Sequence, residues 1–205
     1  MMKTYRFSLL AGILLALAFI FACSGNDSVA YGGQIYKIAK IGNQTWFAEN
    51  LNYDVDGSKC YDNKPENCAK YGRLYDWATA VKACPSGWHL PSNAEWDELF
   101  RYVEDEENDD ASSPYNSLTA GKHLKATTGW NEGGNGTDKY GFSALPGGGG
   151  ISDGFYDVGY GGRWWSSSEN NSDYASLRLM SCHRERAYWG DDVKFYLFSV
   201  RCLKD

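Results

Sequence analysis

The chain has 205 residues, of which 43% are hydrophobic and 16% aromatic, and its formal net charge is −6. This length suits one domain, and a domain of this size buries about 70% of the surface that its unfolded chain exposes. An acidic chain without a basic stripe lacks the electrostatic footprint of a nucleic-acid-binding protein, so we expect no nucleic-acid partner.

The N-terminus has the pattern of a lipoprotein signal peptide. Residues 7–22 are an unbroken apolar run of 16 residues behind Lys3 and Arg6. This run is shorter than the roughly 20 residues of a membrane span and is typical of a signal peptide. It ends in Ile20-Phe21-Ala22-Cys23, which resembles the bacterial lipobox, where cleavage precedes a cysteine that is then lipidated. An ordinary secretory signal with Cys23 merely nearby is the alternative.

We therefore expect a signal peptide over residues 1–22, the lipidated Cys23 with a tether over residues 23–33, and a single domain over residues 34–205. The tether residues are small and polar, which suits a flexible link. Ser24 stands where, by resemblance to lipoprotein sorting rules, an aspartate would retain the protein in the inner membrane. The expected location is extracytoplasmic, with the lipid anchored in the outer membrane or at the cell surface.

The domain begins with the pattern of a β-hairpin. The stretch QIYKIAKI is followed by Gly42-Asn43 and then by QTWFAENL, which predicts two strands joined by a two-residue turn. Both faces of these strands hold apolar residues, so we expect the hairpin to be covered on both sides.

The richest stretch is residues 74–103. Leu74, Trp77, Val81 and Cys84 recur at spacings of three and four, which predicts a first helix that ends before Pro85. Trp88-His89-Leu90 predicts a short strand. Ser92 and Glu95 form the pattern of a capping box. The second helix that begins there has an apolar stripe consisting of Trp96, Leu99, Phe100 and Val103.

The remaining sequence predicts loops and strands. Residues 104–110, EDEENDD, favour a solvated acidic loop over a calcium loop, because the spacing of calcium ligands is missing. Residues 129–162 contain 13 glycines, which predicts unusual backbone angles and little secondary structure. The later strands are expected over residues 174–180, 185–189 and 194–202.

Five cysteines follow Cys23, and in an oxidising compartment pairing is the default. Five cysteines with one left over allow 15 arrangements. Cys60 and Cys68 flank a polar loop and are expected to staple it; Cys84 with Cys202 would close a long loop and leave Cys182 free. A C-x-x-C pair is absent, so we expect no structural zinc site of that type, no metal ligands and no cofactor.

From residue 33 to the C-terminus, the chain resembles the Fibrobacter succinogenes major paralogous domain family. The matching stretches are GQIYKIAKIGNQTWFAENLNY, YGRLYDWATAV, CPSGWHLPSNAEW, GWNEGGNGTDKYGFSALPGG, RWWSSSE and FSVRC. This family is similar to the C-type-lectin-like fold shared by the formylglycine-generating enzyme. The resemblance implies an α+β fold with two helices packed on short antiparallel sheets and a long glycine-rich loop. It also implies a Cys84–Cys202 disulfide.

We expect a non-catalytic binding or adhesion module that acts through the region from Gly129 to Trp165, with a polysaccharide or a cell-surface protein as its ligand. Loops on a rigid scaffold are the usual place for binding, and flat aromatic faces stack on sugar rings. Trp130 and Tyr156 are expected to be exposed, whereas Trp164 and Trp165 are expected to anchor the core at the base of the loop. The candidate ligand-binding residues are Trp130, Tyr156, Tyr160, Trp164 and Trp165.

Two alternatives have weaker support in the sequence, and we expect no catalytic residues. A calcium-dependent lectin would use oxygen ligands, for which Asp153, Asp157, Glu169 and Asp173 are present, but the family tripeptides of sugar-binding lectins are missing. An oxidase like the formylglycine-generating enzyme would need two thiolates for copper. The stretch around Cys182 resembles its active strand, but Ala187 stands where the second cysteine would be.

Overall fold

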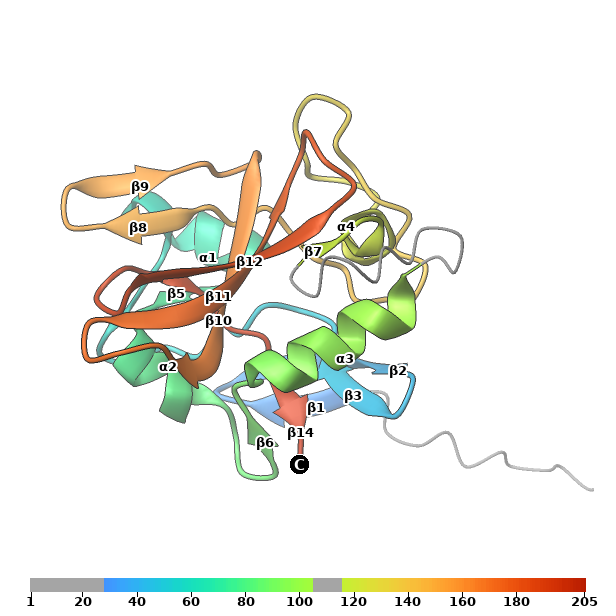
Figure 1. The fold of residues 1–205 in the computed structure, drawn as a ribbon. Helices are drawn as coiled ribbons and strands as arrows, with labels where there is room; N and C mark the ends of the chain where they lie inside the picture. The colour runs from blue at the N-terminus through green and yellow to red at the C-terminus, as the bar shows by residue number, and fades with distance from the viewer. Residues whose placement is uncertain (1–27, 105–115) are drawn as a thin grey trace, which may run out of the picture.

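The computed structural model describes residues 28–104 and 116–205 (Figure 1). It has a mixed α+β architecture of short helices and mostly antiparallel sheets, as the sequence predicts. The predicted signal peptide, Cys23 and the acidic residues 105–110 lie outside the described residues. Within the described part of the chain, no helix is both long and apolar enough to cross a membrane.

The five-stranded sheet contains the predicted hairpin. β2 (Gln34–Ile41) pairs with β3 (Gln44–Phe47), and Ile41 lies opposite Gln44 across the Gly42-Asn43 turn. Gly42 has a φ of 59°, a conformation that glycine adopts without strain. The other strands, in the spatial order β1-β2-β3-β14-β6, are β1 (Ser28–Tyr31), β14 (Leu203–Lys204) and β6 (Trp88–His89). The first and last described strands of the chain therefore belong to one sheet.

The strand β1 corrects the predicted tether. Residues 28–31 pair with β2 along their whole length, from Ser28 opposite Lys37 to Tyr31 opposite Gln34. Val29 and Tyr31 pack against the hydrophobic core, and the Tyr31 and Tyr53 rings lie 4.7 Å apart. This packing orders a segment whose small, polar composition favoured a flexible link. The predicted tether therefore cannot extend beyond residue 27.

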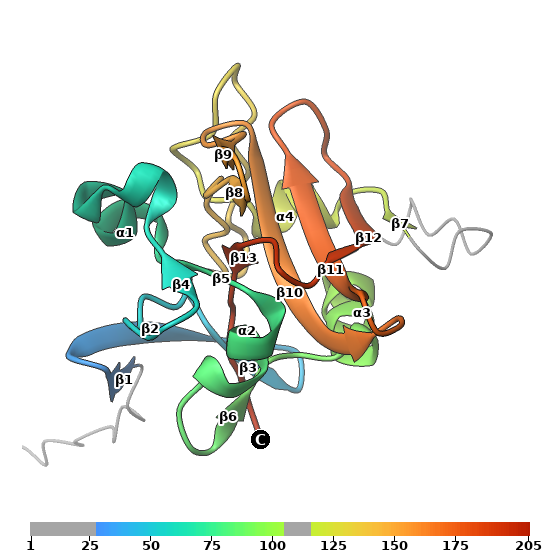
Figure 2. The same ribbon diagram turned by 90° about the vertical axis from the view of Figure 1, so that its left-hand side faces the viewer.

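The seven-stranded sheet crosses the middle of the molecule (Figure 2). Its spatial order is β4-β5-β13-β10-β11-β12-β7, and all neighbours are antiparallel except β10 and β13. The long strands are β10 (Gly161–Glu169), β11 (Tyr174–Ser181) and β12 (Ala187–Val193). The short strands are β4 (Ser58–Lys59), β5 (Leu74–Tyr75), β13 (Phe198–Ser199) and β7 (Asn116–Ser117).

The strand predictions in this sheet are confirmed in part. β11 matches the predicted strand over residues 174–180, and β12 overlaps the one over residues 185–189 but continues to Val193. The predicted strand over residues 194–202 is wrong in extent, because only Phe198–Ser199 pair in this sheet, between β10 and β5. Residues 194–197 form the connection between β12 and β13.

The predicted first helix is shorter than expected. Leu74 belongs to β5, and α2 (Trp77–Ala83) begins after Asp76, whose carboxylate accepts a hydrogen bond from the backbone N–H of Thr79 at 2.8 Å. An N-cap of this kind satisfies an otherwise unpaired helix donor. The pairing of β5 with β4 and β13 decides against the helix at Leu74.

The second helix is confirmed in full. α3 (Asn93–Val103) begins with the reciprocal capping box of Ser92 and Glu95, and it buries Trp96, Leu99, Phe100 and Val103. The remaining helices are short: the 3₁₀ helix η1 (Tyr61–Asn63), α1 (Pro65–Tyr71) and α4 (Ala120–Leu124).

Two apolar clusters fill the core, and the strands β3 and β10 each lie between them. In β3, Trp46 faces one cluster and Phe47 the other; in β10, Trp164 and Trp165 divide in the same way. All four side chains are fully buried. Side chains that alternate between the two faces of a strand explain this arrangement, and the predicted covering of the β2–β3 hairpin on both sides is confirmed.

Both expected disulfides are present. Cys60 is bonded to Cys68 across 8 residues, and Cys84 at the end of α2 is bonded to Cys202 across 118 residues. Cys182 is free and buried. The longer disulfide ties α2 to the C-terminal segment just before β14.

A buried polar cluster around Asn50 joins the two sheets. Asn50 Oδ1 accepts hydrogen bonds from Trp164 Nε1 at 2.8 Å and from Arg201 Nη2 at 2.9 Å, and Asn50 Nδ2 donates to the Tyr71 carbonyl at 2.9 Å. Arg201 is fully buried and also donates to the carbonyls of Phe47 and Phe142. Burial lowers the pKa of Arg201, since the charged form loses its hydration.

Candidate functional site

The glycine-rich region contains little secondary structure, as its composition predicts, and its strands lie in its second half. It contains the hairpin of β8 (Gly149–Ile151) and β9 (Gly154–Tyr156), and β10 begins at Gly161. Gly148 has a φ of 69°, and a Cβ at this position would lie 2.3 Å from the Tyr156 carbonyl oxygen. Gly148 therefore serves close backbone approach. The expected unusual angles are confirmed, and the expected scarcity of secondary structure is confirmed over residues 129–148, whereas strands begin at Gly149.

Three of the five candidate aromatics cannot stack on a ligand. Trp130 is 4% exposed, which corrects the expectation that it is exposed; its indole N–H donates to the Ala144 carbonyl at 2.9 Å. Trp164 and Trp165 are fully buried in the two core clusters, and their indole N–H groups donate to Asn50 and to the Tyr75 carbonyl. Buried aromatics with paired N–H groups hold the core together.

The other two candidates are at least partly accessible. Tyr160 is 43% exposed, whereas Tyr156 is half-buried under the Arg163 guanidinium, which lies 4.7 Å from its ring centre. Burial raises the pKa of the Tyr156 hydroxyl, although Arg163 acts in the opposite direction. Arg163 is in turn paired with Asp157 at 2.8 Å. Arg163 thus covers part of the Tyr156 ring, and Tyr160 is the more available of the two rings.

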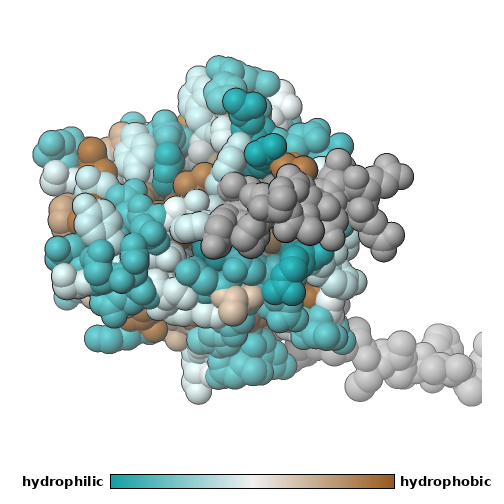
Figure 3. Space-filling view, in the orientation of Figure 1, coloured by the Kyte–Doolittle hydropathy of each residue, from teal (hydrophilic) through white to brown (hydrophobic). Residues whose placement is uncertain are grey.

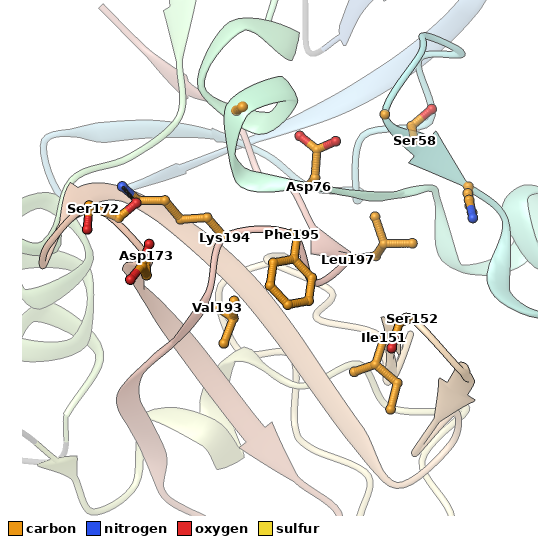
Figure 4. A pocket seen from close by; sticks show the side chains of 13 residues that line it. Ser58, Asp76, Ile151, Ser152, Ser172, Asp173, Val193, Lys194, Phe195 and Leu197 are labelled. Carbon is orange, nitrogen blue, oxygen red and sulfur yellow. Dashed lines mark hydrogen bonds between the residues drawn. The ribbon is translucent and has the colours of Figure 1, made fainter.

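A pocket of about 650 Å³ lies where the β8–β9 turn meets the loops at the end of the seven-stranded sheet (Figure 4). Phe195 lies in its middle, with Asp76 on one side, Asp173 and Ser172 on another, and Ile151 with Ser152 opposite them. This volume falls in the range of small-molecule sites, about 300–1,000 Å³. The other residues that line the pocket are Gly57, Ser58, Lys59, Ala78, Val193, Lys194 and Leu197.

Backbone hydrogen bonds fix the walls of this pocket to one another. Gly150 and Leu197 exchange two bonds, of 2.9 and 2.8 Å, so the β8–β9 hairpin is held against the β12–β13 connection. Lys194 N–H donates to the Asp173 carbonyl, and the Lys194 carbonyl accepts from Trp77 N–H, both at 2.9 Å. The β10–β11 turn and the start of α2 are therefore attached to the β12–β13 connection. Backbone hydrogen bonds thus preform the walls of the pocket.

The side chains of the pocket combine an apolar surface with polar groups at its edge. Phe195 is 66% exposed and Ile151 is 37% exposed, so both present apolar surface in the pocket. Figure 3 shows that hydrophilic residues cover most of one face of the molecule, with apolar residues in small separate spots. An exposed ring beside hydroxyls and carboxylates suits a ligand that has both an apolar face and hydroxyl groups.

The polar groups of the pocket differ in availability. Lys194 Nζ is occupied: it pairs with Glu169, donates to the Asn171 and Ser172 carbonyls, and lies 4.7 Å from the Trp77 ring centre. One oxygen of Asp76 caps α2. The Asp173 carboxylate and the Lys59 ammonium group have no hydrogen-bond or ion-pair partner within residues 28–104 and 116–205, so these two charged groups of the pocket are available to a ligand.

The four acids considered for calcium do not gather around one point among the described residues. Asp157 is paired with Arg163 and Glu169 with Lys194, whereas Asp173 lies in the pocket and Asp153 in the β8–β9 turn. The described residues hold one group of three ligand types that lie close together, namely Glu132, Cys182 and His183. Cys182 and His183 are consecutive, but Glu132 lies on a distant segment, so the sequence alone does not predict that the three residues meet.

The comparison with protein families concerns the domain as a whole. Residues 39–204 match the model of the Fibrobacter succinogenes major domain. The chain belongs to this family. The match runs from Ala39 in β2 to Lys204 in β14 and includes the pocket, while β1 and the start of β2 lie outside it. The resemblance noted in the sequence is confirmed. No curated protein and no solved structure matches the chain.

Sequence reasoning missed the central residue of the pocket, Phe195. It follows Lys194 in a stretch, KFYLFSVRC, that reads as one continuous strand. The available signal was weak: Phe195 and Tyr196 are adjacent apolar residues, and a strand with one covered face would direct only one of them to the core.

Proposed function

We propose that this Fibrobacter succinogenes major domain is a non-catalytic binding module, with a polysaccharide as its ligand, and that the pocket around Phe195 is its binding site. The single observation that supports this proposal is the exposed Phe195 ring at the centre of a preformed pocket with carboxylates and hydroxyls at its edge. Sugars combine an apolar ring face with hydroxyl groups, and aromatic rings stack on that face.

The proposal keeps the glycine-rich region but changes its role. Ile151 and Ser152 of the β8–β9 turn form one wall of the pocket, and the aromatic ring comes from the β12–β13 connection. Because Trp130, Trp164 and Trp165 are buried, the ligand contacts expected of them pass to Phe195. Tyr160 remains as an exposed ring within the region first considered.

The location of the protein is a proposal of the same kind. A signal peptide ending before Cys23 would leave a lipid at Cys23 and place the domain outside the cytoplasm. Two disulfides support this location, because such bonds persist in oxidising compartments. The C-type-lectin-like arrangement is likewise proposed, supported by the disulfide that joins the end of α2 to the C-terminal strand.

The test is a glycan array and an insoluble-polysaccharide pull-down with the purified protein, each with and without EDTA. Phe195→Ala removes the proposed stacking surface, and Asp173→Asn removes the available carboxylate. Tyr102→Ala is the matched control, because Tyr102 on α3 is 55% exposed and does not line the pocket. Tyr160→Ala tests the exposed ring of the glycine-rich region separately.

The expected result is binding that EDTA does not change, that Phe195→Ala weakens by about tenfold or more, and that Tyr102→Ala leaves unchanged. A loss of about 1.4 kcal/mol corresponds to that factor and matches the extra energy of aromatic contacts. Binding that EDTA abolishes indicates a calcium-dependent lectin instead. If no glycan binds in either condition, carbohydrate is the wrong ligand class.

A further inference from the structure

Three metal-ligating side chains meet at the turn that follows β11. Cys182 Sγ, a ring nitrogen of His183 and a carboxylate oxygen of Glu132 all lie within 4.8 Å of one another. His183 Nδ1 is 3.3 Å from Glu132 Oε2. Cys182 is 6% exposed, whereas the side chains of His183 and Glu132 are more than half exposed. A buried thiol beneath two accessible ligands forms a cluster that is open to solvent on one side.

The turn that contains Glu132 packs closely against the backbone of Cys182. Glu132 and Gly133 both have positive φ angles, of 52° and 73°, and Gly134 N–H donates to the Asn131 carbonyl at 2.9 Å. These angles define a tight turn in which glycine, asparagine or aspartate is the usual second residue. The chain places a glutamate there. A Cβ at Gly134 would lie 2.3 Å from the Cys182 Cα, so this glycine brings the turn against the cysteine.

The backbone on the other side is fixed by Lys125. Its ammonium group donates to the carbonyls of Ser181 at 3.1 Å and of Arg184 at 2.9 Å, and it lies 5.2 Å from the Trp130 ring centre. Cys182 N–H donates to the Tyr160 carbonyl at 2.8 Å. Cys182 and His183 are therefore held in a turn whose two ends are both anchored, which preorganises them as neighbours.

We propose that Glu132, Cys182 and His183 bind a zinc-class divalent metal ion and leave its fourth coordination position open to solvent. Thiolate, imidazole and carboxylate are the ligands of zinc, and bonds of about 2.0–2.3 Å in a tetrahedral arrangement place ligand atoms a little over 3 Å apart. The 3.3 Å between His183 and Glu132 fits one edge of such a tetrahedron. Calcium takes oxygen ligands only, and a two-thiolate copper site would need a second free cysteine.

The charges at the site are compatible with a bound cation. A divalent ion together with one thiolate and one carboxylate has no net charge, so the Lys125 ammonium group does not face an excess of positive charge. Three protein ligands with one open position are typical of zinc sites that take a water molecule or an external ligand. None of these three residues lines the pocket around Phe195, so the metal site is independent of the proposed polysaccharide binding.

The test is a titration of the metal-free protein with Co²⁺, followed by competition with Zn²⁺. Co²⁺ reports its ligands in the absorption spectrum, because a thiolate ligand produces a charge-transfer band that a carboxylate or imidazole does not. The variants are Cys182→Ser, His183→Gln and Glu132→Gln. His89→Gln is the matched control, since His89 also lies between two carboxylates, Glu95 and Asp205, but has no cysteine in its cluster.

The expected result is one metal ion per chain, a thiolate charge-transfer band, and binding at least about tenfold weaker in each of the three variants, because even indirect partners of metal ligands have effects of that size. His89→Gln is expected to bind as the wild type does. Glu132 and His183 are exposed, so their variants are informative even if Cys182→Ser does not fold. A missing charge-transfer band, or wild-type affinity in Glu132→Gln and His183→Gln, would overturn the proposal.

Discussion

Asn50 is the side chain on which the packing of the two sheets should depend most, and Asn50→Ala tests this dependence. The substitution removes the acceptor of the buried Trp164 Nε1–H and of two Arg201 N–H groups. An unsatisfied buried neutral donor costs about 1–3 kcal/mol, and a lost hydrogen bond to a charged group about 1.5–3 kcal/mol. Arg201 keeps its bonds to the Phe47 and Phe142 carbonyls. We therefore expect a loss of about 4 kcal/mol in the free energy of unfolding.

The assay is equilibrium denaturation of the wild type, Asn50→Ala, Asn50→Asp and the control Asn170→Ala. Asn170 is exposed and donates one hydrogen bond to Asp191, so its substitution should change the free energy of unfolding by less than about 0.5 kcal/mol. Asn50→Asp keeps the acceptor oxygens for Trp164 and Arg201, and should lose less stability than Asn50→Ala. A loss below about 1 kcal/mol in Asn50→Ala would refute the role that we assign to this cluster.

Three further predictions concern stability. Replacing both cysteines of the Cys84–Cys202 disulfide by alanine should lower the free energy of unfolding by about 5 kcal/mol, and replacing those of Cys60–Cys68 by about 2.5 kcal/mol. The first loss is larger because that disulfide closes a loop across 118 residues, and the second a loop across 8, so it restricts the unfolded chain more. Equal losses in thermal or chemical denaturation would contradict this. Partial burial opposes protonation of His89, but its hydrogen bonds to Asp205 and Glu95 raise its pKa overall, so its stabilisation should be complete below about pH 6.5 and disappear as the pH rises through the raised pKa. The melting temperature of the wild type should therefore fall more steeply than that of His89→Gln above about pH 6.5, and parallel curves would argue against this ion pair. Gly148→Ala should destabilise the β8–β9 hairpin, because the added Cβ meets the Tyr156 carbonyl and the φ of 69° disfavours alanine. The control is Gly141→Ala, at a residue that also has a positive φ but where a Cβ has open space around it. If Gly148→Ala is no less stable than this control, the close approach is unimportant.

Much of the scaffold could be predicted from local patterns. The two-residue turn at Gly42-Asn43, the capping box of Ser92 and Glu95, and the apolar stripe of α3 all depend on residues a few positions apart. Helical spacing predicts a helix at Leu74, but pairing with β4 and β13 decides its conformation, and the spacing does not reveal these partners. The strand β1 likewise depends on its pairing with β2, which the small, polar composition of its segment does not reveal.

The candidate sites depend on contacts that the sequence does not reveal. The pocket combines segments near residues 58, 76, 151, 173 and 195, which backbone bonds bring together. The residues around Trp130 have a composition typical of an exposed loop, yet its ring is buried, with Lys125 over the ring and the Ala144 carbonyl at its indole N–H. Glu132 and Cys182 meet only because Gly134 allows two backbones to touch.

The most direct test of the account is the affinity of the wild type and of Phe195→Ala for the polysaccharide retained in the pull-down, measured by titration with a soluble fragment of it. We predict that the wild type binds, that Phe195→Ala binds about tenfold more weakly or not at all, and that Tyr102→Ala binds as the wild type does. Equal affinity of Phe195→Ala and the wild type would contradict the central claim that the pocket around Phe195 is the binding site.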